Sequence, residues 1–177
     1  MRRLVMILAA TAAASALWAT AGSLDAWAQS RFTSSEKDFS VAFPRPPAIE
    51  RRGAETDDAS GYRSYLARDG QRAFLVQVDQ YPRGIPVPAP DPEAYELILR
   101  AYAVASASRL KSTTPVRLSG YEGLQGSFAR PAGGAEIRWV VMVGRRIYQL
   151  SYAGVDADDV AASAPAFLDS FTLTPEG

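Results

Sequence analysis

The chain has 177 residues, with 19 Lys and Arg against 19 Asp and Glu, and it contains neither cysteine nor histidine. Without these two residue types, Ser-His-Asp and Cys-His catalysis, zinc sites with imidazole or thiolate ligands, and thiol redox chemistry are excluded. The balanced charge gives no overall attraction to nucleic acid or to an anionic membrane surface. Chemistry based on carboxylate, lysine, tyrosine or arginine side chains stays open.

The first 28 residues have the organisation of a secretory signal peptide. A pair of arginines precedes an apolar, alanine-rich run over residues 4–21, and a small-x-small pattern for signal peptidase ends at Ala28. We therefore expect cleavage between Ala28 and Gln29 and a periplasmic or secreted product without stable membrane insertion. An uncleaved membrane anchor is the alternative, because the run is about as long as the ~18 residues needed to cross a bilayer.

Residues 29–177 are expected to form a single domain, because a chain of this length buries ~70 % of the surface of its unfolded state. The absence of cysteine excludes disulfide bonds, so burial of apolar side chains must stabilise the exported product. No internal repeat and no second domain boundary is visible. We expect a monomer.

Several strands are predicted by short apolar or alternating runs that end at turn-forming residues. They cover residues 39–43, 48–52, 62–68, 72–81, 116–119, 124–130 and 137–143, the run after residues 144–145, and residues 171–174. The run over 137–143 is apolar on both faces, which is typical of a central strand covered from both sides. The run over 48–52 is predicted to be an edge strand.

Two hairpin turns set the expected strand registers. With residues 69–70 (Asp-Gly) as a two-residue loop, Tyr65 would lie opposite Phe74. Residues 144–145 (Gly-Arg) can form a type II′ turn, which has glycine at its first position. This second turn would place Val141 opposite Tyr148, Trp139 opposite Leu150, and Ile137 opposite Tyr152.

The first of two predicted helices follows a proline-rich connector over residues 81–92. Asp91 is suited to the N-cap and Pro92 to the first helical position, and the helix is expected to end near Ser108. Apolar residues recur at helical spacing and define one buried face. They are Tyr95, Ile98, Leu99 and Tyr102.

The second predicted helix begins after the capping residue Asp156. Its apolar face consists of Val160, Ala164, Phe167 and Leu168. Pro165 is expected to split this helix, with Ser163 capping a second short piece. Antiparallel hairpins with helices able to cover both faces predict an α+β fold. We expect an α/β/α sandwich around a central antiparallel sheet of about six to seven strands.

The order of these elements and several short motifs resemble the PsbP-like superfamily. The motifs are Phe39-x-Val41-x-Phe43-Pro44, Gly120-x-x-Gly123, Tyr148-Gln149-Leu150 and Phe167-Leu168-Asp169-Ser170-Phe171. The superfamily includes the extrinsic photosystem II subunit P, a small Ran-binding import factor and many exported bacterial proteins. The resemblance implies an α/β/α sandwich with a non-enzymatic binding or assembly role. The metal-associated histidines of photosynthetic members have no counterpart in this chain, so a photosystem role is unsupported. We expect no cofactor and no metal.

Two groups of acidic residues are candidate sites with simpler explanations. Residues 156–159 (Asp-Ala-Asp-Asp) have the acid density of a calcium loop, but acids also favour the first turn of a helix. Glu122 and Glu136 could form a carboxylate pair of the glycosidase type if the sheet brought them together. Surface glutamates near turns are the alternative interpretation.

Three arginines and one tyrosine are the candidates for partner binding. Arg138 lies in an otherwise apolar strand, where a charge must be paired or face a groove. Arg145 and Arg146, at a hairpin tip, could hold a carboxylate or phosphate group, and solvated turn arginines are the simpler alternative. Tyr81 begins the proline-rich connector, which could dock in an aromatic groove of a partner.

The residue types that are present favour an exported, non-catalytic binding or assembly module. Its partner would be a protein or another component of the cell envelope. A small-molecule carrier with a cavity between sheet and helix is the first alternative. A hydrolase based on paired carboxylates is the second, and it would need two acids that converge in a cleft.

Overall fold

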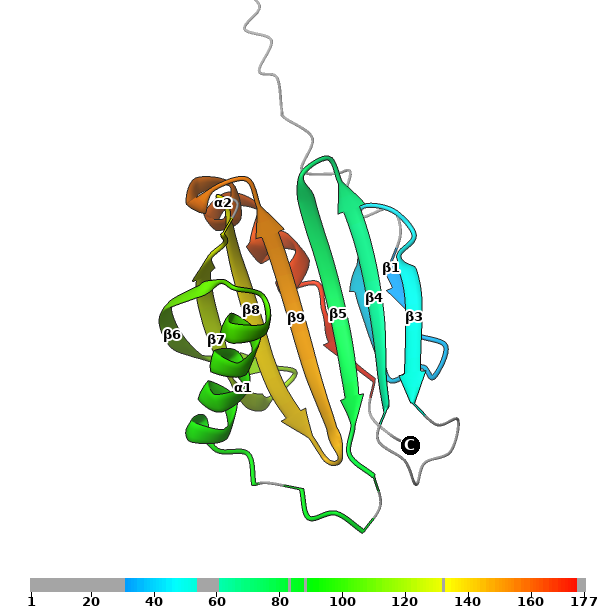
Figure 1. The fold of residues 1–177 in the computed structure, drawn as a ribbon. Coiled ribbons are helices and arrows are strands. Elements are labelled where there is room, and N and C mark those ends of the chain that lie inside the picture. Colours follow the sequence, from blue (N-terminus) through cyan, green and yellow to red (C-terminus); the bar gives the residue numbers. More distant parts are fainter. Residues whose placement is uncertain (1–30, 54–60, 83, 88, 132, 175–177) are drawn as a thin grey trace, which may run out of the picture.

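A computed structural model describes residues 31–53, 61–82, 84–87, 89–131 and 133–174. The predicted cleavage site at Ala28 and Gln29 lies outside these residues. Seven strands form one antiparallel sheet in the order β3-β4-β5-β9-β8-β7-β6 (Figure 1). They are β3 (Ala48–Gly53), β4 (Gly61–Asp69), β5 (Arg72–Gln80), β6 (Arg109–Leu118), β7 (Tyr121–Ala129), β8 (Ala135–Val143) and β9 (Arg146–Gly154). The α+β architecture predicted from the sequence is confirmed.

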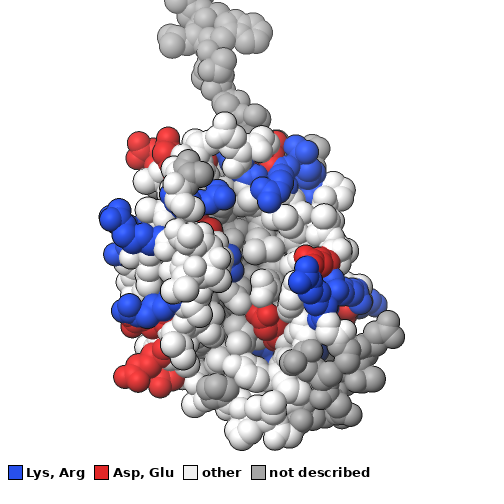
Figure 2. Space-filling model, viewed as in Figure 1, with Lys and Arg blue, Asp and Glu red and all other residues white. Residues whose placement is uncertain are grey.

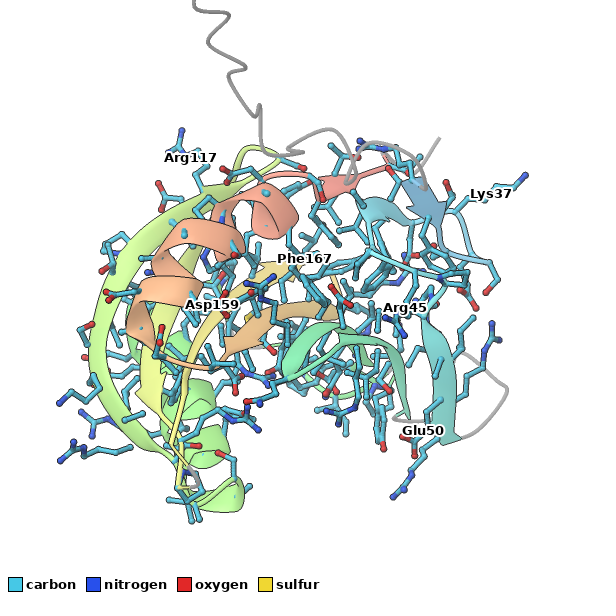
Figure 3. The ribbon with its side chains drawn as sticks, turned by 90° about the horizontal axis from the view of Figure 1, so that it is seen from above. Lys37, Arg45, Glu50, Arg117, Asp159 and Phe167 are labelled. Carbon is cyan, nitrogen blue, oxygen red and sulfur yellow. The ribbon has the colours of Figure 1, made fainter. Side chains whose placement is uncertain are left out.

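A second, three-stranded sheet covers one face of the large sheet together with a helix. It has the order β1-β2-β10, with β1 (Arg31–Thr33), β2 (Phe39–Ala42) and β10 (Thr172–Leu173). Helix α2 (Ala157–Leu168) lies beside it on β8 and β9. Apolar side chains of both elements, such as Phe39 and Phe167, are fully buried against Phe74 and Leu150 of the sheet. Seen from above, Phe167 points into this layer while Lys37 and Arg117 project outward (Figure 3).

Helix α1 (Pro92–Ala105) packs on the opposite face, over β6, β7 and β8. Asp91 caps its N-terminus by accepting a hydrogen bond from the Glu93 amide, and Pro92 occupies the first turn, as predicted. Tyr95 and Leu99 are buried against Phe128 and Val140. The helix ends at Ala105, three residues before the predicted Ser108, where Ser106 caps it through hydrogen bonds to the preceding turn.

The β4–β5 hairpin has a different register from the predicted one. Asp69 is still in the ladder opposite Arg72, so the loop consists of Gly70 and Gln71, and Tyr65 lies opposite Val76. The reason is that Gly70, with φ +58°, takes the first loop position. Aspartate at that position would have needed the left-handed conformation instead. The β8–β9 hairpin follows the same rule with Gly144, and all three of its predicted cross-strand pairs are confirmed.

Two other predictions from the sequence are wrong. Helix α2 is continuous through Pro165, because Pro165 and Ala161 both face solvent. The carbonyl of Ala161 that loses its helical partner can therefore be hydrated. Strand β6 begins at Arg109 and not at Val116. Its first half is exposed and polar, so it shows no hydrophobic periodicity.

No helix within the described residues is long and apolar enough to cross a membrane.

Candidate functional site

The α1 face of the large sheet is only half covered. Helix α1 packs on β6, β7 and β8, and no element of the described chain lies over β4 and β5 on this side. Figure 2, in the same orientation as Figure 1, shows a hollow between the helix and the outer strands. We call this hollow, with the α1-side residues of β4, β5 and β9, the open groove.

The strand registers define what lines the open groove. Leu66 of β4, Leu75 of β5 and Ser151 of β9 lie side by side across the sheet. In the neighbouring row, Gln77 of β5 lies opposite Gln149 of β9. Beyond Ile147, β9 carries Gln149, Ser151 and Ala153 on this face, while the opposite face of the same strand carries tyrosines and a leucine. Small residues on β9 thus deepen the groove beside the helix.

Arg138 of β8 forms the wall between helix α1 and the groove. Its side chain and that of Glu136 are each only 4 % exposed, and the two form an ion pair of 3.1 Å. The guanidinium carbon lies 3.6 Å from the ring centre of Tyr102, which is a cation–π contact. Tyr102 in turn donates a 2.7 Å hydrogen bond to Glu136. The prediction that Arg138 must be paired or face a groove is therefore confirmed.

A chain of hydrogen bonds runs from this wall across the groove floor. Arg138 donates to Gln149 Oε1 (3.1 Å), and Gln149 donates its amide to Asp79 Oδ2 (2.8 Å). Gln77 donates to the other oxygen, Asp79 Oδ1 (2.8 Å). The chain links three strands and fixes the orientation of every polar group in it. Such a preorganised polar strip beside partly buried leucines can hold a partner surface without reorganisation.

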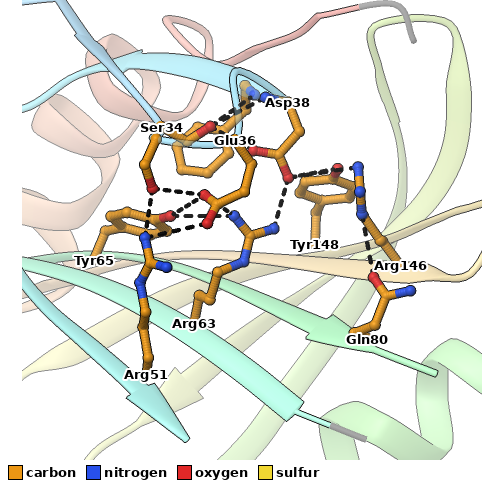
Figure 4. Close-up of polar contacts among 11 residues, drawn as sticks. Ser34, Glu36, Asp38, Arg51, Arg63, Tyr65, Gln80, Arg146 and Tyr148 are labelled. Atoms are coloured by element: carbon orange, nitrogen blue, oxygen red, sulfur yellow. Dashed lines mark hydrogen bonds and ion pairs between the residues drawn. The ribbon is translucent and has the colours of Figure 1, made fainter. Parts of the chain in front are cut away.

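A second polar cluster lies on the opposite face, where the β1–β2 turn meets the large sheet (Figure 4). At its centre is Asp38, whose side chain is 4 % exposed. Asp38 accepts hydrogen bonds from Ser34, from Arg63 (2.9 Å) and from Tyr148 (3.2 Å). Arg146 lies 3.8 Å from the same carboxylate. We call these residues the Asp38 cluster.

The hydrogen bonds and charges of the Asp38 cluster hold the β1–β2 hairpin on the large sheet. Burial alone would raise the pKa of Asp38, but the hydrogen bonds from Ser34 and Arg63 and the Arg63 charge lower it below its usual value. Burial and the neighbouring Asp38 charge raise the pKa of Tyr148 to about 12. The carboxylate is therefore ionised and the phenol neutral near pH 7. These groups are joined to one another by hydrogen bonds and ion pairs, as is typical of a polar cluster that holds two parts of a fold together.

The four residues predicted to bind a partner do not form one surface. Arg138 is buried on the α1 face against Tyr102, whereas Arg146 lies on the opposite face and donates to Gln80 (3.2 Å). Arg145 donates to the backbone carbonyls of Tyr81, Pro82 and Ile85. It thereby fastens the start of the proline-rich connector to the hairpin tip, and the described residues of that connector form no strand or helix. Partner binding by these residues stays a prediction.

The acidic candidates are separated from one another. Glu136 lies opposite Phe128, six positions along β7 from Glu122, which corresponds to about 20 Å at ~3.3 Å per residue. A glycosidase-type pair needs the carboxyls within ~10 Å, so Glu122 and Glu136 do not form one. The alternative, surface glutamates, holds for Glu122 and is wrong for Glu136, which is buried. Of the acids at 156–159, Asp156 caps helix α2 by accepting from the Asp159 amide (2.8 Å). Asp159 pairs with Arg72 at 2.5 Å and also accepts a hydrogen bond from Tyr152.

The groove floor was missed by sequence reasoning. Asp79, Gln77 and Gln149 alternate with buried apolar residues in their strands, and this pattern by itself indicates only one buried face. The available signal was the polar half of β9, where Gln149 and Ser151 alternate with buried aromatic and aliphatic residues. Only the register of β5 on β9, set by strands far apart in the sequence, shows that these polar groups meet.

The sequence matches no protein-family model and no curated protein. The fold is similar to that of cyanobacterial PsbP (CyanoP) from Synechocystis sp. PCC 6803, known from a solution structure. The two chains are 10 % identical and superpose with a TM-score of 0.54, over 82 % of this chain and 92 % of the cyanobacterial one. The likeness confirms the PsbP-like fold predicted from the sequence. At this level of identity it establishes the fold alone.

Proposed function

We propose that the protein is an exported, non-catalytic binding module that holds a protein partner of the cell envelope in the open groove. The observation that carries the proposal is the half-covered sheet face. Leu66 and Leu75 are only partly buried there, although most apolar residues of the neighbouring strands are buried under a second layer. Apolar surface beside fixed polar groups is the usual composition of a protein-binding site.

The proposal of export depends on the sequence of the first 28 residues, and the proposal of a binding role accords with the PsbP-like fold. The chemistry of the groove fits binding better than catalysis. Glu136 and Arg138 neutralise each other, and the amides of Gln77 and Gln149 occupy both oxygens of Asp79.

The test is affinity capture from the envelope fraction with immobilised domain 29–177. Leu75→Glu places a charge on the groove floor and should reduce the recovered amount of a specific partner at least tenfold. The matched control is Leu97→Glu, because Leu97 lies on the outer side of helix α1 and is 69 % exposed. Both variants should keep the circular-dichroism spectrum of the native domain. Equal recovery of the same proteins by both variants would refute the groove as the binding surface.

A small-molecule carrier is the competing outcome of this experiment. In that case Leu75→Glu would leave the captured proteins unchanged, and native mass spectrometry of the wild-type domain from its own envelope would show a bound compound.

A further inference from the structure

We infer that the segment that fills the open groove is an amphipathic helix of the partner, with an apolar stripe and a basic residue. This inference rests on the proposed function, because it names what the groove binds. Three features of the groove carry it: the hydrogen bonding of its strands, its dimensions and its charge.

The strands of the groove floor have no free backbone groups to offer. β4, β5 and β9 each pair with a neighbour on both sides, so their amides and carbonyls are already used in the sheet. An extended segment lying on this face would bury its own amides and carbonyls without partners. A helix makes its backbone hydrogen bonds internally and exposes only side chains. The groove therefore favours a helix over an extended peptide.

The uncovered area has the size of one helix. With ~4.8 Å between strands, the distance from β9 to β3 is about 14 Å, and a helix with its side chains is ~10–12 Å wide. Helix α1 demonstrates the same packing on the other half of this face, where Leu99 approaches the sheet at Gly126. A Cβ on Gly126 would lie 3.1 Å from Leu99 Cδ2, so α1 lies close to the strands. A partner helix beside α1 would complete that layer.

The side chains of the groove floor favour an apolar stripe on the partner helix. Leu66 and Leu75 are adjacent across β4 and β5, and Ala73 and Ala153 continue the apolar surface in the next row. Residues spaced three and four apart on a helix would cover these positions. The apolar surface spans β4 and β5 at Leu66, Leu75 and Ala73, while β9 presents Ser151 beside Leu75.

The charge of the groove floor favours a basic side chain on the partner helix. Arg138 is matched by Glu136, so Asp79 contributes one negative charge. Within the part of the chain that the structure describes, Asp79 has amide partners and no cation at ion-pair distance. Acidic atoms are visible in the lower part of the hollow in Figure 2. A lysine or arginine of the partner would find there an oriented carboxylate. The ring of Tyr62, opposite Asp79 on β4, is already covered by Arg52, whose guanidinium carbon lies 5.9 Å from the ring centre.

The experiment is photo-crosslinking in cells that produce the protein. A benzophenone amino acid replaces Leu75 on the groove floor, and the crosslinked peptide is sequenced by mass spectrometry. Ser64, half-exposed on β4, is the alternative position if Leu75 is not tolerated, and Ala161 on the solvent side of α2 is the control position. We expect one partner segment with apolar residues at helical spacing and at least one lysine or arginine.

The same segment, as a synthetic peptide, should gain helical circular dichroism when the purified domain is added. Asp79→Asn should weaken its binding at least fivefold, and the matched control Asp169→Asn, at the end of α2, should not. An acidic or non-helical segment, or equal binding to Asp79→Asn, would overturn the inference and leave the groove as a binding site. Absence of any crosslink from both groove positions would refute the proposed function as well.

Discussion

Removing the charge of Asp38 should destabilise the whole domain. Asp38→Asn keeps the size of the side chain but leaves Arg63 and Arg146 without their buried carboxylate. The amide can satisfy only part of the donors from Ser34, Arg63 and Tyr148. The β1–β2 hairpin, which carries Phe39 and Val41 of the core, would lose its main polar contact with the large sheet.

The size of the effect follows from burial. Removing one partner of a buried ion pair costs roughly 3–5 kcal/mol. The side chain of Arg63 is 16 % exposed and keeps its ion pair with Glu36, so part of this cost is avoided. We expect the free energy of unfolding to fall by about 2–3 kcal/mol at pH 7. The exposed carboxylate of Asp169 provides the control, and Asp169→Asn should change it by less than ~0.5 kcal/mol.

The pH dependence gives a second measurement of the same interaction. Because the folded-state pKa of Asp38 is lowered, its stabilisation is complete above the unfolded pKa and is lost as pH falls through the folded pKa. The stability of wild type and Asp38→Asn, from urea denaturation at constant ionic strength, should therefore converge below about pH 4. A difference below ~0.5 kcal/mol at pH 7, or one that stays constant down to pH 2.5, would refute the anchoring role.

Three further outcomes are expected. Intact-mass analysis of the exported protein should show a chain beginning at Gln29, and a product that retains residues 1–28 in the membrane fraction would disprove cleavage after Ala28. Gly126→Val should lower the free energy of unfolding in urea by ~1–3 kcal/mol, because a Cβ there would lie 2.8 Å from the Phe128 ring; an unchanged midpoint would show that α1 can move away. Arg138→Met should cost about 3 kcal/mol in the same assay by leaving Glu136 buried without its cation, and a loss under 1 kcal/mol would show that the ion pair contributes little to stability.

The sequence predicted the positions of helices and strands better than it predicted how these elements pair and pack. Periodicity located both helices and most strands, because each of them buries one face and shows it as alternation or helical spacing. Glycine at the first loop position set the register of the β8–β9 hairpin correctly. The same rule applied to Gly70 would have corrected the register of the β4–β5 hairpin, where the Asp-Gly motif suggested another loop.

The open groove could not be predicted, because it depends on what a helix leaves uncovered. Helix α1 is long enough to reach several strands, and its sequence does not show which of them lie beneath it. Trp139 illustrates the same difficulty on the other face: it was expected in the core of a central strand. It is only partly buried there, and its indole donates to Gln125 at 2.7 Å.

The large sheet consists of two halves that join at a single seam. Strands β3 to β5 pair with their neighbours in sequence, as do β6 to β9, whereas β5 and β9 bring together residues such as Gln80 and Arg146, which are 66 positions apart. Closing a loop of that length costs about 3–4 kcal/mol of chain entropy before the pairing compensates for it. The hairpins can therefore form early, and the seam must form late.

Because β5 and β9 are also the floor of the open groove, neither half of the sheet contains the groove by itself. A partner that docked there, as we propose, would distinguish completely folded molecules from those in which only the hairpins have formed.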